Sequence, residues 1–251
     1  MKFFAKTTNH AALVATFSIA LGACQSVDAQ RFERVVVDED MAGGYGLEIA
    51  DIDGDGLLDI VALATTPAQF VWYRNPTWEK YRITADSRAD IAAAAQDIDG
   101  DGDIDLVLAS EFNLAASTEG GLVQWFENPG NPMQNQEWQA YTIDRVPTSH
   151  RLRWGSFSAN GVKSLINLPI IGVGASAPTY EGGAELKAYE IPENPKGPWG
   201  SVVLKNDLEM AHGIAVLDWN EDGRDDVITA SFAGVNLLEF GVDSSFVRST
   251  Q

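Results

Sequence analysis

Two stretches of this 251-residue sequence each place at least four aspartates within nine positions. One runs from Asp51 to Asp59 and the other from Asp97 to Asp105. Carboxylates stand at positions 1, 3, 5 and 9 of each stretch, and a glycine at position 6 permits a sharp turn. Because like charges this close repel one another, a folded protein that keeps them needs a cation among them.

The spacing of the carboxylates indicates which cation. Hard oxygen donors at these positions, with the main-chain carbonyl of position 7, are typical of a calcium-binding turn. A helical EF-hand would need a glutamate at position 12, which is Ala62 in the first copy, Leu108 in the second and Thr229 in a third. The flanking segments are short, β-rich and bounded by glycine, as strands are. We therefore predict about three calcium sites in turns between strands. The predicted ligands are Asp51, Asp53, Asp55, Leu57 and Asp59; Asp97, Asp99, Asp101, Asp103 and Asp105; and Asp218, Asn220, Asp222, Arg224 and Asp226.

The aspartate turns mark an internal repeat. A degenerate copy, "SFSANGVKSLI", begins at Ser156 and keeps the glycine at Gly161 but has no carboxylate at the ligand positions. The four copies start at steps of 46, 59 and 62 residues, which is typical of propeller blades and similar β arrays. Each unit offers one strand into the turn, one out of it, a third with an aligned aromatic residue and, in the first three units, a fourth.

This pattern predicts an all-β fold, a β-propeller of four recognisable blades within residues 31–251. The repeats lie at about 45–85, 89–144, 150–207 and 211–241. Two forms remain open, a small closed ring and a shortened relative of a larger propeller. The fourth unit lacks a fourth strand, and we expect "RFERVVVDED" near the N-terminus to supply it and close the ring.

The N-terminal residues are typical of an export signal. Lys2 and Lys6 precede an apolar run at 11–21, which is too short to span a bilayer but fits a signal-peptide core. "LGAC" ends at Cys24, the single cysteine of the chain, and resembles a bacterial lipobox. We expect a lipoprotein signal peptide at 1–23, a linker at 24–30, and a lipid on Cys24 that anchors the protein to the outer membrane. The alternative is a periplasmic or secreted protein cleaved after Ala29.

The net charge of −19, with 36 acidic and 17 basic residues, excludes a nucleic-acid partner, because binding a phosphate backbone requires the opposite sign. A solubilising surface explains such acidity as well as calcium sites do.

Four residues are candidates for a site in the central channel: Tyr45, His150, Arg153 and His212. Tyr45 and the two histidines each stand six residues before a turn start, so equal height predicts that they converge on a bound group or on a second divalent metal. Histidines that simply cap a packed strand are the ordinary alternative. Arg153 aligns with Glu48, which indicates either an ion pair between blades or a clamp for a carboxylate or sugar.

The repeats resemble the FG-GAP and VCBS families, which implies propeller blades with calcium-binding loops. "HRLRWG", "LPIIG" and "KAYEIP" are also similar to the propeller part of aldos-2-ulose dehydratases. That resemblance implies metal-assisted elimination of water from oxidised sugars, with His150, Arg153 and His212 as metal or substrate groups.

The sequence contains no nucleophile elbow, phosphate loop, "HExxH" or dinucleotide fingerprint, so hydrolase, kinase and redox functions have no support. We favour a non-catalytic, calcium-binding lipoprotein that serves as a binding, adhesion or scaffold module for a carbohydrate or protein ligand. The alternative is a sugar lyase or dehydratase of the aldos-2-ulose type, in active or degenerate form.

Overall fold

A computed structural model describes residues 32–134, 137–158, 161–241 and 246–250. The chain divides into two units, Met1–Val36 and Val37–Gln251. In the first unit only residues 32–36 are described, and they form no strand or helix. The predicted signal peptide, Cys24 and the cleavage position at Ala29 therefore lie outside the described residues. Within these residues, no helix is both long and apolar enough to cross a membrane.

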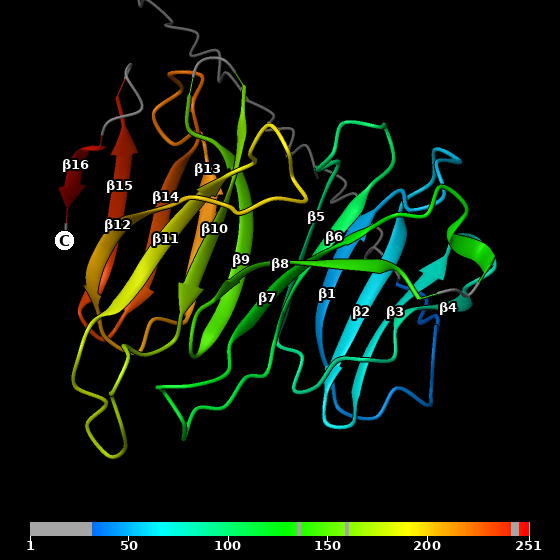
Figure 1. Ribbon diagram of the computed structural model, residues 1–251, viewed down its shortest axis with the longest axis horizontal. Coiled ribbons are helices and arrows are strands. Elements are labelled where there is room, and N and C mark those ends of the chain that lie inside the picture. The colour runs from blue at the N-terminus through cyan, green and yellow to red at the C-terminus, as the bar shows by residue number, and fades with distance from the viewer. Residues whose placement is uncertain (1–31, 135–136, 159–160, 242–245, 251) are drawn as a thin grey trace, which may run out of the picture. The chain divides into compact units, whose positions relative to one another are not determined.

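The second unit contains four antiparallel sheets of four strands, which we call blades 1 to 4 in chain order (Figure 1). Blade 1 contains β1 (Gly44–Ala50), β2 (Asp59–Thr65), β3 (Ala68–Arg74) and β4 (Glu79–Thr84). Blade 2 contains β5 (Ala92–Gln96), β6 (Asp105–Ser110), β7 (Leu122–Glu127) and β8 (Gln139–Arg145), with a short 3₁₀ helix, η1 (Pro132–Gln134), before β8. Blade 3 contains β9 (Ser149–Ser156), β10 (Lys163–Pro169), β11 (Ala184–Glu190) and β12 (Ser201–Leu208). Blade 4 contains β13 (Gly213–Leu217), β14 (Asp226–Ser231), β15 (Gly234–Phe240) and β16 (Phe246–Thr250).

The first strand of each blade lies beside the first strand of the next, β1 beside β5, β5 beside β9 and β9 beside β13. Neighbouring sheets thus meet along one inner edge and diverge from it, as propeller blades do. The predicted fold class is confirmed: the protein is an all-β propeller with four blades.

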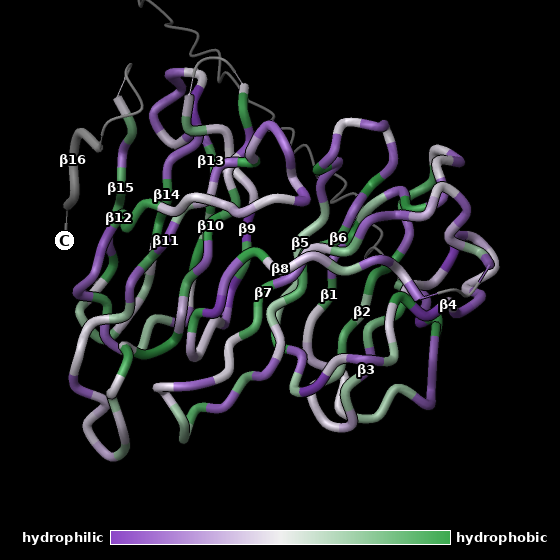
Figure 2. Tube along the Cα trace, viewed as in Figure 1, coloured by the Kyte–Doolittle hydropathy of each residue, from purple (hydrophilic) through white to green (hydrophobic). Residues whose placement is uncertain are grey.

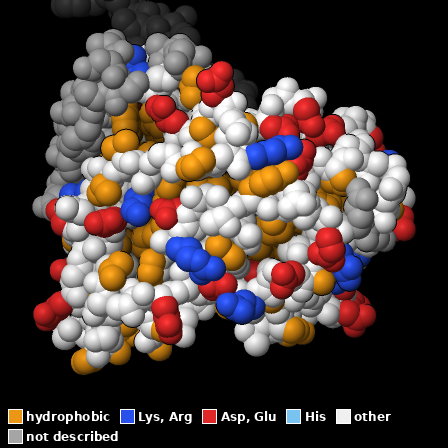
Figure 3. Space-filling view, viewed as in Figure 1, with side chains coloured by type: hydrophobic (Ala, Val, Ile, Leu, Met, Phe, Trp, Pro, Cys, Tyr) orange, Lys and Arg blue, Asp and Glu red, His pale blue; other side chains and the backbone are white. Residues whose placement is uncertain are grey.

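Alternation along the strands builds the core. In β2, Val61 and Leu63 point toward blade 2, whereas Ala62 between them points to the other side of the sheet. Hydrophobic stretches lie mainly along the strands and hydrophilic ones mainly in the turns (Figure 2). On the face seen in Figure 3, acidic and basic side chains are scattered rather than gathered in one patch.

Large aromatic side chains fill the junctions between blades. Trp72 and Phe126 are buried between blades 1 and 2, and Trp125 and Tyr189 between blades 2 and 3. The junction between blades 3 and 4 is mostly aliphatic, with Leu186 among its fully buried residues. Each blade is therefore held mainly by apolar contact with its neighbours.

The expected N-terminal closing strand is wrong for the residues that the structure describes. Residues 32–43 belong to no sheet, and β16 pairs with β15 as the fourth strand of blade 4. Val37 and Met41 instead pack against the outer side of blade 1, where the Tyr73 hydroxyl donates to Oδ2 of Asp38 at 2.6 Å. An edge strand needs only free backbone groups to pair with, so the sequence pattern did not determine which segment takes that edge.

Candidate metal sites and a histidine cluster

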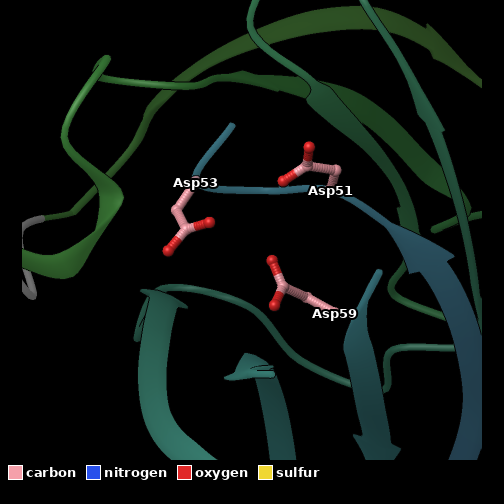
Figure 4. A group of neighbouring side chains, drawn as sticks. All are labelled: Asp51, Asp53 and Asp59. Atoms are coloured by element: carbon pink, nitrogen blue, oxygen red, sulfur yellow. The ribbon is translucent and has the colours of Figure 1, made fainter. Parts of the chain in front are cut away.

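The first acidic turn joins β1 to β2. Asp51, Asp53 and Asp59 each offer a carboxylate oxygen, and these atoms lie within 4.8 Å of one another. Figure 4 shows the three carboxylates turned toward a common space. Gly56, at φ 87°, has the left-handed backbone that the turn requires and donates its N–H to Oδ2 of Asp51 at 2.9 Å. The second turn gathers the equivalent side chains, Asp97, Asp99 and Asp105.

The aspartate at position 9 also holds the backbone of its blade. Asp59 accepts an N–H from Ile52 in the turn at 2.9 Å and another from Asn75, beyond the end of β3, at 2.8 Å. Burial raises the pKa of Asp59 above its usual value. Asp105 accepts the corresponding bonds in blade 2, and burial raises its pKa to about 6. Asp226 repeats the arrangement in blade 4.

The first two turns fit a divalent cation. Oδ1 of Asp51 and Oδ1 of Asp99 are buried and have no hydrogen-bond partner in the described part of the chain. A buried carboxylate oxygen without a partner costs free energy unless a positive charge faces it. Calcium binds such oxygens, so the donor set suits it chemically.

The aspartate at position 5 of the first turn, Asp55, does not belong to the group of three carboxylates. Oδ1 of Asp55 accepts the N–H of Leu57 at 2.9 Å, while its Oδ2 faces the Arg74 guanidinium at 3.1 Å. Arg74 also forms an ion pair with Asp53 and brings a positive charge to the first turn. In the second turn, Asp101 likewise accepts the N–H of Asp103. The residues at position 7, Leu57 and Asp103, thus donate their backbone N–H groups to the aspartate at position 5.

The third turn differs from the first two. Asp218 accepts the N–H of Gly223 at 2.9 Å, and the amide of Asn220 accepts that of Asp222 at 3.0 Å. Arg224 at position 7 forms an ion pair with Asp222 at 2.8 Å. Among the described residues, only the first two turns gather three carboxylates.

One amide connects the first two turns. Asn128, which is 4% exposed, follows β7 and donates its backbone N–H to Asp105 at 2.8 Å. Its side-chain Nδ2 donates to the carbonyl of Ile104 in the second turn at 3.1 Å and to that of Ile52 in the first at 2.9 Å. The Asn-Pro turn that ends the third strand marks this place in both blades, at Asn75 and Asn128, but the repeat gave no signal for the bond to Ile52.

The structure brings together the three residues that share one register. The Tyr45 hydroxyl on β1 lies 3.0 Å from Nε2 of His150 on β9. The ring of His212, just before β13, has its centroid 4.7 Å from that of His150. Phe112, which the sequence analysis did not identify, packs its ring 5.6 Å from His150. The insertion between β10 and β11 packs behind it, with Ile170 and Ile171 in an apolar cluster that Phe112 joins.

His150 is electrically neutral at physiological pH. Burial, followed by the charges of Arg151 and His212, lowers its pKa to about 3. The Arg151 guanidinium lies 3.1 Å from Nε2, so this nitrogen accepts and the ring proton belongs on Nδ1. Nδ1 is buried without a partner in the described residues.

Arg153 lies apart from this cluster. Its guanidinium donates to the carbonyl of Leu152 at 2.7 Å, and its charge counteracts the rise that burial causes in the pKa of Glu48. Arg151, which strand alternation places on the opposite face, reaches the imidazole because its long side chain folds back.

Two family comparisons match this chain. The family described as "Aldos-2-ulose dehydratase, beta-propeller domain" matches residues 120–249, just over half of the chain. The chain belongs to this family. The FG-GAP-like repeat matches residues 51–108, which include both carboxylate clusters.

A curated relative in the dehydratase family is aldos-2-ulose dehydratase of Phanerodontia chrysosporium, 26% identical over 204 residues. The alignment covers 78% of this chain but only 21% of that enzyme. The chain thus spans about a fifth of its relative's length.

One solved structure supports the fold and nothing more. A lectin of Agrocybe aegerita that recognises non-reducing terminal N-acetylglucosamine matches with a TM-score of 0.52 and 16% identity, over 84% of this chain and 52% of the lectin chain. A functionally unknown protein of Desulfotomaculum acetoxidans matches with a TM-score of 0.36 and 14% identity, over 82% and 70% of the two chains.

Proposed function

We propose that this protein is a calcium-stabilised propeller that serves as a binding or scaffold module. The observation that supports it most directly is the pair of turns at Asp51 and Asp97, each with three converging carboxylates and one buried oxygen that lacks a partner. A bound calcium ion would supply the positive charge that these oxygens lack. The third turn, at Asp218, would hold a further ion through Asn220 and the main-chain carbonyl of Arg224.

We place this function outside the cytoplasm. The basic and apolar residues before Cys24 support export, with a lipid anchor on Cys24 at the outer membrane or with release after cleavage at Ala29. Sites with dissociation constants of about 10⁻⁴–10⁻³ M are typical of extracellular calcium modules, and turns of this kind suit that range. The ligand of the module would be a carbohydrate or a protein.

Thermal unfolding of the purified protein in EDTA, in calcium and in magnesium tests the calcium proposal. At ten times the dissociation constant, each filled site adds about 1.4 kcal/mol to the free energy of unfolding. For two or three sites this predicts a melting temperature higher by several degrees in calcium than in EDTA. Magnesium should restore less, because it requires a smaller octahedral site. An identical melting temperature with and without chelator would contradict the proposal.

A dehydratase activity is the second candidate, and the match to the propeller domain of aldos-2-ulose dehydratase supports it. Donation from the unpartnered Nδ1–H of His150 to an oxygen of an oxidised sugar would require the residues that bury this atom to move aside. A second divalent metal does not fit at Nε2, because the Arg151 guanidinium and the Tyr45 hydroxyl already face that atom.

Turnover of 2-keto sugars by the wild-type protein, by His150→Ala and by Arg153→Ala tests this activity. If the cluster acts on the substrate, His150→Ala should abolish turnover, whereas Arg153→Ala should retain it because its side chain lies apart. Absence of turnover by the wild-type protein would leave the binding module as the function.

A further inference from the structure

The two end blades each leave part of an apolar face uncovered. At the three internal junctions, one face of each blade packs against the opposing face of the next, and the buried apolar clusters fill the space between them. In the described residues no blade packs on the outer face of blade 1 or on the outer face of blade 4. Figure 1 shows β1 and β13 at opposite ends of the series of first strands.

On blade 1 the open part of this face is its inner strand. Leu47 is 72% exposed and Ile49 is 50% exposed. The residues that stand four before the turn start in blades 2 and 3, as Leu47 does in blade 1, are Ala93 at 8% and Leu152 at 0%. Ile214 holds this place in blade 4 and packs against blade 3. Val37 and Met41 pack on Ala62 of β2 and on Val71 and Tyr73 of β3, all three of them buried, so only β1 remains as an unused part of a junction.

On blade 4 the open face is the one that elsewhere looks toward the next blade. Val235 on β15 is 61% exposed, and its cross-strand partner Ala230 is exposed as well. The residues of the third strands that fill the three internal junctions from this side are all fully buried, at 0%: Phe70, Val123 and Leu186. Blade 4 therefore presents the other unused half.

The exposed apolar part of each face is lined by uncharged residues. The cross-strand pairs there are uncharged, Leu47 with Ala62 and Ile49 with Ile60 on blade 1, and Ala230 with Val235 and Ile228 with Leu237 on blade 4. Charged residues stand farther out on the same faces, Lys80 and Arg82 opposite Tyr73 and Val71 on blade 1, and Glu239 two residues beyond Leu237 on blade 4. In a chain of net charge −19, two uncharged apolar areas that remain in water are unusual. The two areas also correspond to the two opposing sides of a junction between blades, and the chain contains three such junctions.

We propose that two copies of this chain associate head to tail, with the open face of blade 1 of one copy packed on the open face of blade 4 of the other. A second copy fits better than an unrelated partner because each open face continues the internal junctions and finds its opposite half on the same chain. Two such contacts close a ring of eight blades, within the range of four to eight that propellers commonly have. A heterologous contact that closes in this way ends growth at the dimer.

The mass of the purified protein in solution tests this proposal. Light scattering after size exclusion should give twice the mass of one chain at micromolar concentration. Leu47→Asp and Val235→Asp should each weaken the dimer at least tenfold, because a carboxylate would be buried in the contact. Val173→Asp is the matched control, since Val173 is 73% exposed but lies in the loop between β10 and β11. Melting curves establish that all three variants fold.

Mixing the variants tests the head-to-tail arrangement. The Leu47→Asp chain keeps an intact blade 4 face and the Val235→Asp chain keeps an intact blade 1 face, so an equimolar mixture retains one unaltered junction. We expect dimers in the mixture at concentrations where neither variant pairs alone. A monomeric wild-type protein, an open polymer, or a dimer that only one of the two variants disrupts would each overturn the proposal.

Discussion

The hydroxyl of Tyr45 lies 3.0 Å from Nε2 of His150, although 105 residues separate them. The bond joins β1 of blade 1 to β9 of blade 3 across the inner edge where the blades meet. With His212 of blade 4 against the same imidazole, one buried ring contacts residues of two other blades. His150 therefore has a structural role whether or not it contacts a ligand.

Tyr45→Phe should lower the free energy of unfolding by about 1 kcal/mol, since it removes one partly buried hydrogen bond and little apolar area. Urea unfolding in calcium-containing buffer measures the change. The double variant with His150→Ala should then lose little more than His150→Ala alone, because the partner of the hydroxyl is already absent. Additive losses would show that the bond is not formed in solution.

Asp51→Asn and Asp99→Asn should each weaken calcium binding about tenfold or more, because each removes a carboxylate from a cluster of three. The backbone N–H that Asp51 accepts remains satisfied by the new amide oxygen, so the turn itself should persist. Asp103→Asn is the control, since it removes one negative charge of the second turn at a position expected to bind through its main-chain carbonyl. Isothermal titration with calcium gives the affinity and stoichiometry of each variant. If Asp103→Asn weakened calcium binding equally, the loss of affinity would follow from the change in net charge and not from a lost ligand.

Asp90→Asn should stabilise the protein at neutral pH. Asp90 is fully buried and receives a hydrogen bond from Ser87, and burial raises its pKa to about 6. Since this pKa lies above the unfolded value of about 3.9, the group contributes stability at low pH that is lost as the pH rises from about 4 to 6. The variant lacks this loss, so its advantage over the wild-type protein should grow to about 2 to 3 kcal/mol at pH 7.

Urea unfolding of wild type and Asp90→Asn at pH 4.5 and pH 7 measures that difference. Asp86→Asn, at an exposed aspartate nearby, serves as the control and should show a difference that is small at both pH values. An advantage of Asp90→Asn that does not change with pH would contradict the assigned titration.

Tyr189→Phe should cost about 1.5 to 3 kcal/mol in the free energy of unfolding. The Tyr189 hydroxyl is buried between blades 2 and 3 and donates to the Asp144 carboxylate at 2.7 Å, which is a bond to a charged acceptor. Tyr141→Phe is the matched comparison, because Tyr141 donates to Glu127 at 2.9 Å nearer the surface and should cost less. Thermal or urea unfolding ranks the two, and a larger loss for Tyr141→Phe would contradict this account.

The sequence predicted the features that local spacing encodes. The places of Asp51 and Gly56 in the turn follow from nine consecutive residues. Because the unit recurs four times, its period also indicated the propeller and placed Tyr45 at the height of His150.

Features that depend on long-range geometry were not predicted. Asn128 shares its place after the third strand with Asn75, but its bond to the neighbouring turn depends on how the blades pack. Arg151 rather than Arg153 reaches His150 because side-chain flexibility overrides strand alternation. The choice between the N-terminal segment and β16 as the last strand of blade 4 depends on tertiary pairing, to which a short edge strand adds little signal of its own.

The side chain of Asn128 joins the first two acidic turns by hydrogen bonds. Its Nδ2 group is shared between carbonyls of successive turns, and its backbone anchors to the carboxylate that closes the second. A change in the backbone of one turn therefore moves a hydrogen-bond partner of the other. Calcium binding to the two turns should therefore be cooperative, and the turns of the first two blades should become more or less ordered together.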